Sequence, residues 1–287
     1  MSNNIKIEVA EKAGFCFGVE RAVGLVEETL KNSKKPVYCW GDLIHNPLAM
    51  NRLEKKGLRI IKNLEDLAEG AVFIVKSHGM ALEDLDSVKQ KTTEIVDTTC
   101  PFVVKAQYYA KEFKKRGLKV IIIGDREHVE VKGIKSRANN NAFVANNLAE
   151  LKKIKDKLTG KIGVICQTTQ KSSKLREIVE GLKELGLELE IKNTICLNTI
   201  EKQQEVSEIS AETDLLIVIG GLHSSNTTKL AEMGRAKKIK TYHVENADDI
   251  LQEWFSDGMN VFLTAGASTP SDEITKAKEI IEKFNFK

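Results

Sequence analysis

The sequence lacks an apolar run long enough to cross a membrane, a cationic and apolar leader at its start, and any C-x-x-C pair of cysteines. The first two absences predict a protein that is neither membrane-spanning nor exported. The third argues against a zinc finger, which takes its ligands from closely spaced pairs. The chain also lacks a strong charge of either sign. Its 44 basic and 41 acidic residues leave a net charge of +3, which predicts no nucleic-acid partner.

The cysteines are few and scattered. There are five in 287 residues, an odd number in a chain without a leader, which predicts a reducing, cytoplasmic environment and no disulfides. Their remaining roles are metal binding, catalysis or packing. With 41% hydrophobic residues, the chain is long enough for one large domain or for two to three smaller domains.

Two of the cysteines stand in almost the same phrase, "IVDTTCPFV" around Cys100 and "IKNTICLNT" around Cys196, and a looser copy, "EKAGFCFGVERA", surrounds Cys16. Each phrase opens a run with helical spacing. Each run is followed by three further shared features. The first is an apolar strand ending in glycine, as in "VIIIGD". The second is a strand that turns into an Asn-started helix, as in "AFVANNLAEL". The third is a strand ending in a polar turn, as in "VFIVKSHGM". Four features in three copies indicate a tandem of three α/β units.

We place the units at residues 16–99, 100–195 and 196–287, and we expect residues 1–15 to complete the third unit. Continuous apolar strands that alternate with helices predict mainly parallel sheets covered on both faces. The strand "IKIEV" at 5–9 has no preceding unit, so we expect it to pair with the third unit and close the ring. Three equivalent units around a pseudo-threefold axis would bring their three cysteines together.

The repeat separates the cysteines into two groups. Cys39 and Cys166 lie within or at the end of strands, where a cysteine usually packs as a small hydrophobic residue. The other three occupy the same position in every copy, at a helix N-terminus that favours the thiolate. Three thiolates are one short of a cubane [4Fe–4S] cluster or a closed zinc site, so one metal position would stay open. The spacing favours a cluster but leaves zinc possible.

Polar residues gather in the loops that follow the predicted strands, where parallel sheets form their ligand crevice. Histidines, hydroxyls and strand-end amides suit an anion such as a diphosphate, without a Walker loop or magnesium. The candidate residues are His45, His78, His128, Ser224, Ser225, Asn226 and Ser268. Glu130 lies two residues from His128 and is a candidate proton donor. His243 lies inside a strand and is expected to be packed or exposed without a role.

Taken together, "AGFCFGVERA", "IHN", "SHG", "DTTCPFV", "HVEV", "QTT", "NTIC", "SSN" and "AGAST" resemble the 4-hydroxy-3-methylbut-2-enyl diphosphate reductases. The motifs occur in order from Cys16 to Ser268. The resemblance implies a trefoil of three α/β domains around a central, oxygen-sensitive iron–sulfur cluster. It also implies the last step of the methylerythritol phosphate route to isoprenoids, in which two electrons and protons remove water to give isopentenyl and dimethylallyl diphosphates.

The resemblance also implies roles for individual residues. The three ligands of a [4Fe–4S] cluster would be Cys16, Cys100 and Cys196, and its fourth iron would bind the substrate hydroxyl. The diphosphate would be bound by His45, His78, His128, Ser224, Ser225, Asn226 and Ser268. Glu130 would deliver protons, His128 would lie near the proton path, and Thr168 would bind the substrate hydroxyl. The electron donor would be a protein such as ferredoxin or flavodoxin.

The chain departs from the family pattern at two places. The family commonly has Gly-His-Pro-Glu where this chain has Glu127 to Glu130, and Asp where it has Asn193. Two other functions stay open on the residues alone. A zinc-dependent hydrolase of a phosphorylated substrate would contain zinc and no sulfide. A non-catalytic binder of a small anion would have no use for an open metal position or for Glu130.

Overall fold

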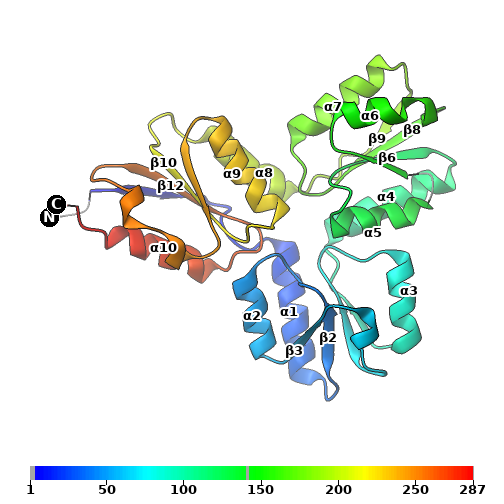
Figure 1. Ribbon diagram of the computed structural model, residues 1–287, viewed down its shortest axis with the longest axis horizontal. Coiled ribbons are helices and arrows are strands. Elements are labelled where there is room, and N and C mark those ends of the chain that lie inside the picture. Colours follow the sequence, from blue (N-terminus) through cyan, green and yellow to red (C-terminus); the bar gives the residue numbers. More distant parts are fainter. Residues whose placement is uncertain (1–3, 140–141, 287) are drawn as a thin grey trace. The chain divides into compact units, whose positions relative to one another are not determined.

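The computed structural model describes residues 4–139 and 142–286, in which the strands form three four-stranded sheets (Figure 1). Every strand pairing within these residues is parallel. The predicted α/β class with parallel sheets is therefore confirmed. Among the described helices, none combines the length and the apolar character that crossing a membrane requires.

The first sheet has the strand order β3-β2-β4-β5. Its strands are β2 (Val37–Trp40), β3 (Leu58–Ile61), β4 (Val72–Val75) and β5 (Ile95–Asp97). The helical elements in this stretch of chain are α1 (Phe17–Asn32), α2 (Pro47–Lys55), η1 (Leu64–Asp66) and α3 (Leu82–Lys91). The edge strand β5 leads directly into the second predicted copy.

The second sheet repeats the arrangement in the order β7-β6-β8-β9. Its strands are β6 (Lys119–Ile123), β7 (Ala142–Ala145), β8 (Ile162–Cys166) and β9 (Leu189–Ile191). Figure 1 shows α4 and α5 on one side of this sheet and α6 and α7 on the other. The helical elements are α4 (Pro101–Lys115), α5 (Val129–Ala138), α6 (Leu148–Ile154), η3 (Lys155–Lys157) and α7 (Ser172–Glu184).

The third sheet contains the N-terminal strand. Its order is β1-β12-β10-β11, and β1 (Lys6–Val9) pairs with β12 (Asn260–Ala265), from Lys6 opposite Asn260 to Val9 opposite Leu263. The prediction that residues 5–9 complete the third sheet is confirmed. The remaining elements are α8 (Leu197–Glu208), β10 (Leu215–Ile219), α9 (Ser225–Ala236), β11 (Lys240–Val244), η4 (Ala247–Asp249), η5 (Gln252–Trp254) and α10 (Ser271–Glu282).

Helices cover both faces of the third sheet, which explains why its inner strand β10 is apolar throughout. Ile217 and Ile219 of β10 pack in one cluster with Ile274 and Ile281 of α10. Val218, which points to the opposite face, packs with side chains of α8 and α9. Each fully buried aliphatic side chain contributes roughly 1.5–3 kcal/mol to the free energy of folding. A strand buried on both faces gains this contribution at every residue, whereas a strand with alternating polar residues gains it only at every second one.

Of the three predicted Asn-started helices, one is an α-helix and two are only short 3₁₀ turns. Asn147 caps α6 by accepting a hydrogen bond from the Glu150 amide at 2.9 Å. Asn246 caps only the 3₁₀ turn η4, and Asn63 precedes the equally short η1 without a side-chain capping bond. A capping residue satisfies first-turn amides, but it does not set the length of the helix that follows.

By its packing, the chain divides into two compact units. One combines the residues up to Glu20, the segment Ile44–Leu53 and the chain from Leu197 onward, and it contains the third sheet. The other combines Arg21–Leu43 with Glu54–Cys196 and contains the first two sheets. The segment Ile44–Leu53 therefore packs with the third sheet, although it lies within the first copy of the repeat.

The pairing of β1 with β12 can be tested with Ile7→Asp. The Ile7 side chain packs against the cluster under α10, and a carboxylate there should lower the free energy of unfolding by about 1–3 kcal/mol. Hydrogen exchange should accelerate in β12 and stay unchanged in β4. The matched control is Glu8→Gln at the exposed neighbouring position. Faster exchange in β4, with β12 unaffected, would contradict the pairing.

Candidate active site

Cys16, Cys100 and Cys196 have the same backbone environment. Each is partly exposed and directly precedes a helix, α1, α4 or α8. Their backbone amides donate to the carbonyl two residues beyond the strand in the middle of a sheet: Cys16 to Ala267 (3.0 Å), Cys100 to Ser77 (2.9 Å) and Cys196 to Thr168 (2.9 Å). The equivalence predicted from the repeat is present in the structure at this local level.

The remaining two cysteines are packing residues. Cys39 of β2 and Cys166 at the end of β8 are fully buried. Burial raises the pKa of the Cys39 thiol to about 12, although Lys76 opposes the rise. A thiol that does not ionise is a poor metal ligand. None of the five cysteines is in a disulfide within the described residues.

His45 lies in the segment that packs with the third sheet. The Ser268 hydroxyl donates to the His45 carbonyl at 3.1 Å. A Cβ atom on Gly221 would lie 2.5 Å from the same carbonyl, so the close approach of the two loops requires glycine there. Two of the predicted anion-binding residues, His45 and Ser268, are thus neighbours within one compact unit.

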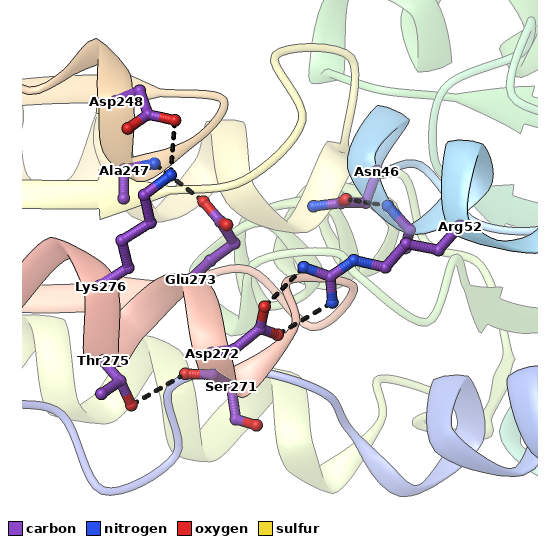
Figure 2. A network of polar contacts seen from close by, with 10 residues as sticks. Asn46, Arg52, Ala247, Asp248, Ser271, Asp272, Glu273, Thr275 and Lys276 are labelled. Atoms are coloured by element: carbon purple, nitrogen blue, oxygen red, sulfur yellow. Dashed lines mark hydrogen bonds and ion pairs between the residues drawn. The ribbon is translucent and has the colours of Figure 1, made fainter.

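A polar network fixes this segment (Figure 2). The Asn46 side chain accepts from the Ala49 amide at 2.9 Å and caps α2. Arg52, further along α2, forms a two-fold hydrogen-bonded ion pair with Asp272 in the first turn of α10, at 2.9 and 2.5 Å. These hydrogen bonds lower the pKa of Asp272. Neither Asn46 nor Arg52 was among the predicted site residues. The role of Arg52 depends on a partner far away in the sequence, whereas the cap at Asn46 is local.

The predicted residues Ser224, Ser225 and Asn226 form the N-terminus of α9. Ser224 is the N-cap and accepts from the Thr227 amide at 3.4 Å, while Ser225 accepts from Lys229 at 2.9 Å. Asn226 is buried, and neither its amide oxygen nor its amide nitrogen has a hydrogen-bond partner among the described residues. A buried amide without partners costs free energy, so this site is suited to a polar ligand at a helix N-terminus.

His128 and Glu130 lie at the start of α5, in the other compact unit. His128 is the N-cap, and its Nδ1 accepts from the Glu130 amide at 3.2 Å. This bond assigns the proton of a neutral His128 to Nε2, which leaves that atom as a donor. The His78 ring meets the His128 ring edge-on, with 5.5 Å between centroids.

Glu130 is fully buried. Its carboxylate accepts from Thr168 twice, from the backbone amide at 2.6 Å and from the hydroxyl at 2.8 Å. Thr168 follows β8, and its carbonyl holds the Cys196 amide. The structure therefore brings the predicted proton donor, the predicted hydroxyl-binding residue and one cysteine loop into one connected set of hydrogen bonds.

Two threonines near the cysteines were missing from the prediction. Thr98 donates through its hydroxyl to the carbonyl of Val75, the last residue of β4, at 2.6 Å. Thr194 does the same to the carbonyl of Cys166, the last residue of β8. Both lie two residues before a cysteine, so the shared "T-x-C" of the two phrases was the signal in the sequence.

The departure at Asn193 preserves its local contact. Asp97 accepts from the Thr99 amide at 2.8 Å through one carboxylate oxygen. Asn193, at the equivalent position, accepts from the Ile195 amide at 3.0 Å through its amide oxygen. Because only one acceptor is used in this contact, asparagine can replace aspartate there.

His243 is half-buried in β11, and its Nε2 lies 2.9 Å from the Gly220 carbonyl. Burial lowers the pKa of its imidazole. Of the two predicted environments, packed or exposed, the half-buried ring agrees with the packed one.

Residues 7–282 match the model of a family described as LytB protein. The chain is 38% identical to the 4-hydroxy-3-methylbut-2-enyl diphosphate reductase of Pelobacter propionicus, over 99% of this chain and all of the relative. It is also 38% identical to the reductase of the same name from Geotalea uraniireducens, over 98% of each chain.

Two solved structures are similar to this one. The E-1-hydroxy-2-methyl-but-2-enyl-4-diphosphate reductase from Plasmodium falciparum has a TM-score of 0.89 and 30% identity, over 98% of this chain and 88% of that chain. A second structure has a TM-score of 0.72 and 34% identity, over 97% and 99% of the two chains. It is described as (E)-4-hydroxy-3-methyl-but-2-enyl diphosphate reductase, the terminal enzyme of the non-mevalonate pathway.

The loop around His128 generates a prediction at Val129. This residue is the first of α5, where proline is favoured because the amide has no partner within the helix. His128 before it has φ −66° and ψ 134°, which a following proline tolerates. Val129→Pro should therefore raise the free energy of unfolding by about 0.4–1 kcal/mol and leave turnover unchanged. Chemical denaturation measures this, with Lys135→Pro, beyond the first turn of the helix and exposed, as the destabilised control.

Proposed function

The chain belongs to the LytB protein family, and from this membership we infer that it is a reductase of 4-hydroxy-3-methylbut-2-enyl diphosphate. The reaction takes up two electrons and two protons, breaks the allylic carbon–oxygen bond and releases one water. The products are isopentenyl and dimethylallyl diphosphates, at the end of the methylerythritol phosphate pathway. The similarity to relatives of this name along almost the whole chain supports the inference.

The observation that carries the proposal is the threefold repetition of the cysteine environment. Each of the three cysteines has its amide bonded to a strand-end loop and its thiol at the start of a helix. A partial positive charge at a helix N-terminus favours a thiolate, and thiolates are the usual ligands of iron–sulfur clusters. We propose that these three residues hold a [4Fe–4S] cluster in which one iron has no protein ligand.

The donor set fits this cluster in number and in chemistry. Three soft thiolates leave one coordination position for the substrate. When bound, the cluster would pass on the electrons that the external donor supplies, and its open iron position would be the site for the substrate hydroxyl. The two alternative functions, a zinc hydrolase and an anion binder, lose support, because the two bacterial relatives described above are reductases.

Two groups of residues are proposed to bind the diphosphate. One comprises His45, Ser268 and the Ser224–Asn226 start of α9, where the buried Asn226 amide has unused hydrogen-bonding atoms among the described residues. The other comprises His78 and His128. The His128 Nδ1 accepts from the Glu130 amide, so a neutral His128 carries its proton on Nε2, and Nε2–H is the group proposed to donate to a phosphate oxygen.

Glu130 and Thr168 are proposed to move the proton. The Thr168 hydroxyl is 2.8 Å from the Glu130 carboxylate, within the distance over which a proton passes between hydrogen-bonded groups. A hydroxyl can both donate and accept, so Thr168 can bind the substrate hydroxyl and relay the proton from a protonated Glu130. Burial of both side chains limits the access of water to this pair.

Three further predictions belong to this proposal. The electrons come from a protein such as ferredoxin or flavodoxin, since the chain has to receive them from outside. The site works in the reducing cytoplasm. The functional units are residues 16–99, 100–195 and 196–287, the last completed by residues 1–15.

The cysteine assignment is tested by replacing all five cysteines one at a time. Cys16→Ser, Cys100→Ser and Cys196→Ser should lower bound iron and sulfide and abolish turnover, because a hydroxyl poorly replaces a soft thiolate. Cys39→Ala and Cys166→Ala should keep the cluster spectrum, since both side chains are packing residues. Equal iron loss in all five anaerobically purified variants would contradict the three-ligand assignment.

The role of Glu130 is tested with Glu130→Gln. Glutamine can keep both contacts to Thr168 but cannot supply an acid proton. Turnover should fall by about a hundredfold or more, while substrate should still perturb the cluster spectrum at nearly the same concentration. In contrast, His45→Ala should weaken binding by roughly ten- to a hundredfold. Full turnover in Glu130→Gln, or a binding loss as large as that of His45→Ala, would exclude Glu130 as the donor.

A further inference from the structure

Lys202, on α8, is a fully buried charged side chain. Its ammonium group donates to three backbone carbonyls: those of Lys12, of Gly14 (3.1 Å) and of Ala265 (3.2 Å). A lysine ammonium has three N–H donors, and each of these carbonyls can take one. Lysine is rarely buried completely unless its charge is compensated, so this arrangement calls for an explanation.

The three carbonyls lie in segments that carry predicted site residues. Gly14 is two residues before Cys16, and Ala265 ends β12, just before the loop of Ser268. Lys202 itself lies one and a half turns into the helix that follows Cys196. The same helix also binds the backbone amide of Lys12, because the Glu205 carboxylate accepts from it at 3.0 Å.

The repeat shows what Lys202 replaces. Before Cys100 and before Cys196, a threonine two residues ahead of the cysteine donates to the last carbonyl of the neighbouring strand, Thr98 to Val75 and Thr194 to Cys166. In the first copy that position is Gly14, which has no side chain, and the corresponding carbonyl is that of Ala265. Lys202 bonds to both of these carbonyls and so closes the connection that threonine makes elsewhere.

Gly14 also explains why threonine is not used there. Its φ is +96°, a conformation that a β-branched residue does not adopt without strain, and a Cβ atom would lie 3.0 Å from Ile274. Lys202 lies six residues after Cys196. The residues six positions after Cys16 and Cys100 are Ala22 and Ala106, and both are fully buried. The helix itself therefore has no need of a lysine at this position.

We propose that Lys202 is a positioning residue for the cluster. Its buried cation fixes the Cys16 loop to the end of β12 and adds positive charge near the negatively charged cluster. This inference rests on the proposed iron–sulfur function. Residues that orient metal ligands typically change metal affinity by about 10–100-fold when they are replaced.

The test compares three variants of the full chain, purified and reconstituted without oxygen. Lys202→Met removes the charge and the donors at similar size. Thr194→Val removes the corresponding hydrogen bond before Cys196, from the Thr194 hydroxyl to the Cys166 carbonyl, without changing charge. Lys237→Met is the matched control, because Lys237 also donates to two backbone carbonyls, those of Ser207 and Ile209, away from the cysteines.

Iron and sulfide retained against a chelator should fall about 10–100-fold in Lys202→Met and in Thr194→Val, and should stay at the wild-type level in Lys237→Met. The reduction potential of the remaining cluster should become more negative in Lys202→Met only, because a nearby cation stabilises the reduced, more negative cluster. A merely structural role would leave the potential of Lys202→Met equal to that of Thr194→Val.

Wild-type retention and wild-type potential in Lys202→Met would overturn the inference while leaving the proposed function intact. A wild-type protein that takes up no iron and sulfide would instead overturn the proposed function. If Lys202→Met does not fold, Lys202→Gln decides, since its amide can still reach two of the carbonyls without carrying charge. An unchanged potential in that variant counts against the proposal, and a more negative one supports it.

Discussion

The hydrogen bond from each cysteine amide to the loop beyond a strand is the contact on which the candidate site depends. It exists because parallel strands end at the same edge of a sheet, and the edge strand of that sheet leads directly into the cysteine. A helix then begins beside the strand-end loop, so thiol, helix N-terminus and polar loop residues are placed together by the backbone alone. Side chains such as Thr98 and Thr194 then fix the distance between the two loops.

Much of this was available from the sequence because it is periodic. The three cysteine phrases, the apolar strands and the loops recur at similar spacing, so sheets, helices and the pairing of β1 with the third sheet could be predicted from one chain. The position of β1 could be predicted because the strands before Cys100 and Cys196 complete the sheets of the preceding units. The strand "IKIEV" before Cys16 has no preceding unit, so it was assigned to the sheet of the third unit. The family resemblance added the expected reaction and an expected role for Thr168 beside the candidate proton donor Glu130. The structure shows hydrogen bonds between these two residues.

Other features could not be predicted because they break the repeat or depend on distant partners. The segment around His45 packs with the third sheet through Ser268 and the Arg52–Asp272 pair, which no local pattern indicates. Asn63 has the sequence of a helix cap but precedes only a short 3₁₀ turn. Lys202 looks like an ordinary helix-surface lysine until it is aligned with Ala22 and Ala106, where a charge stands out against two buried alanines.

The position of β1 at the edge of the last sheet has a consequence for how the chain is made. Lys6 leaves the ribosome long before its partner Asn260 does. Contacts between residues so far apart in the sequence form late, because closing the long loop between them costs conformational entropy before the contact stabilises the fold. The first two sheets can fold during translation, whereas the third has to wait for β12. Since the loop of Cys16 is anchored to β12 through Ala267, this cysteine reaches its final place only after β12 has been synthesised, which disfavours capture of metal by a shorter nascent chain.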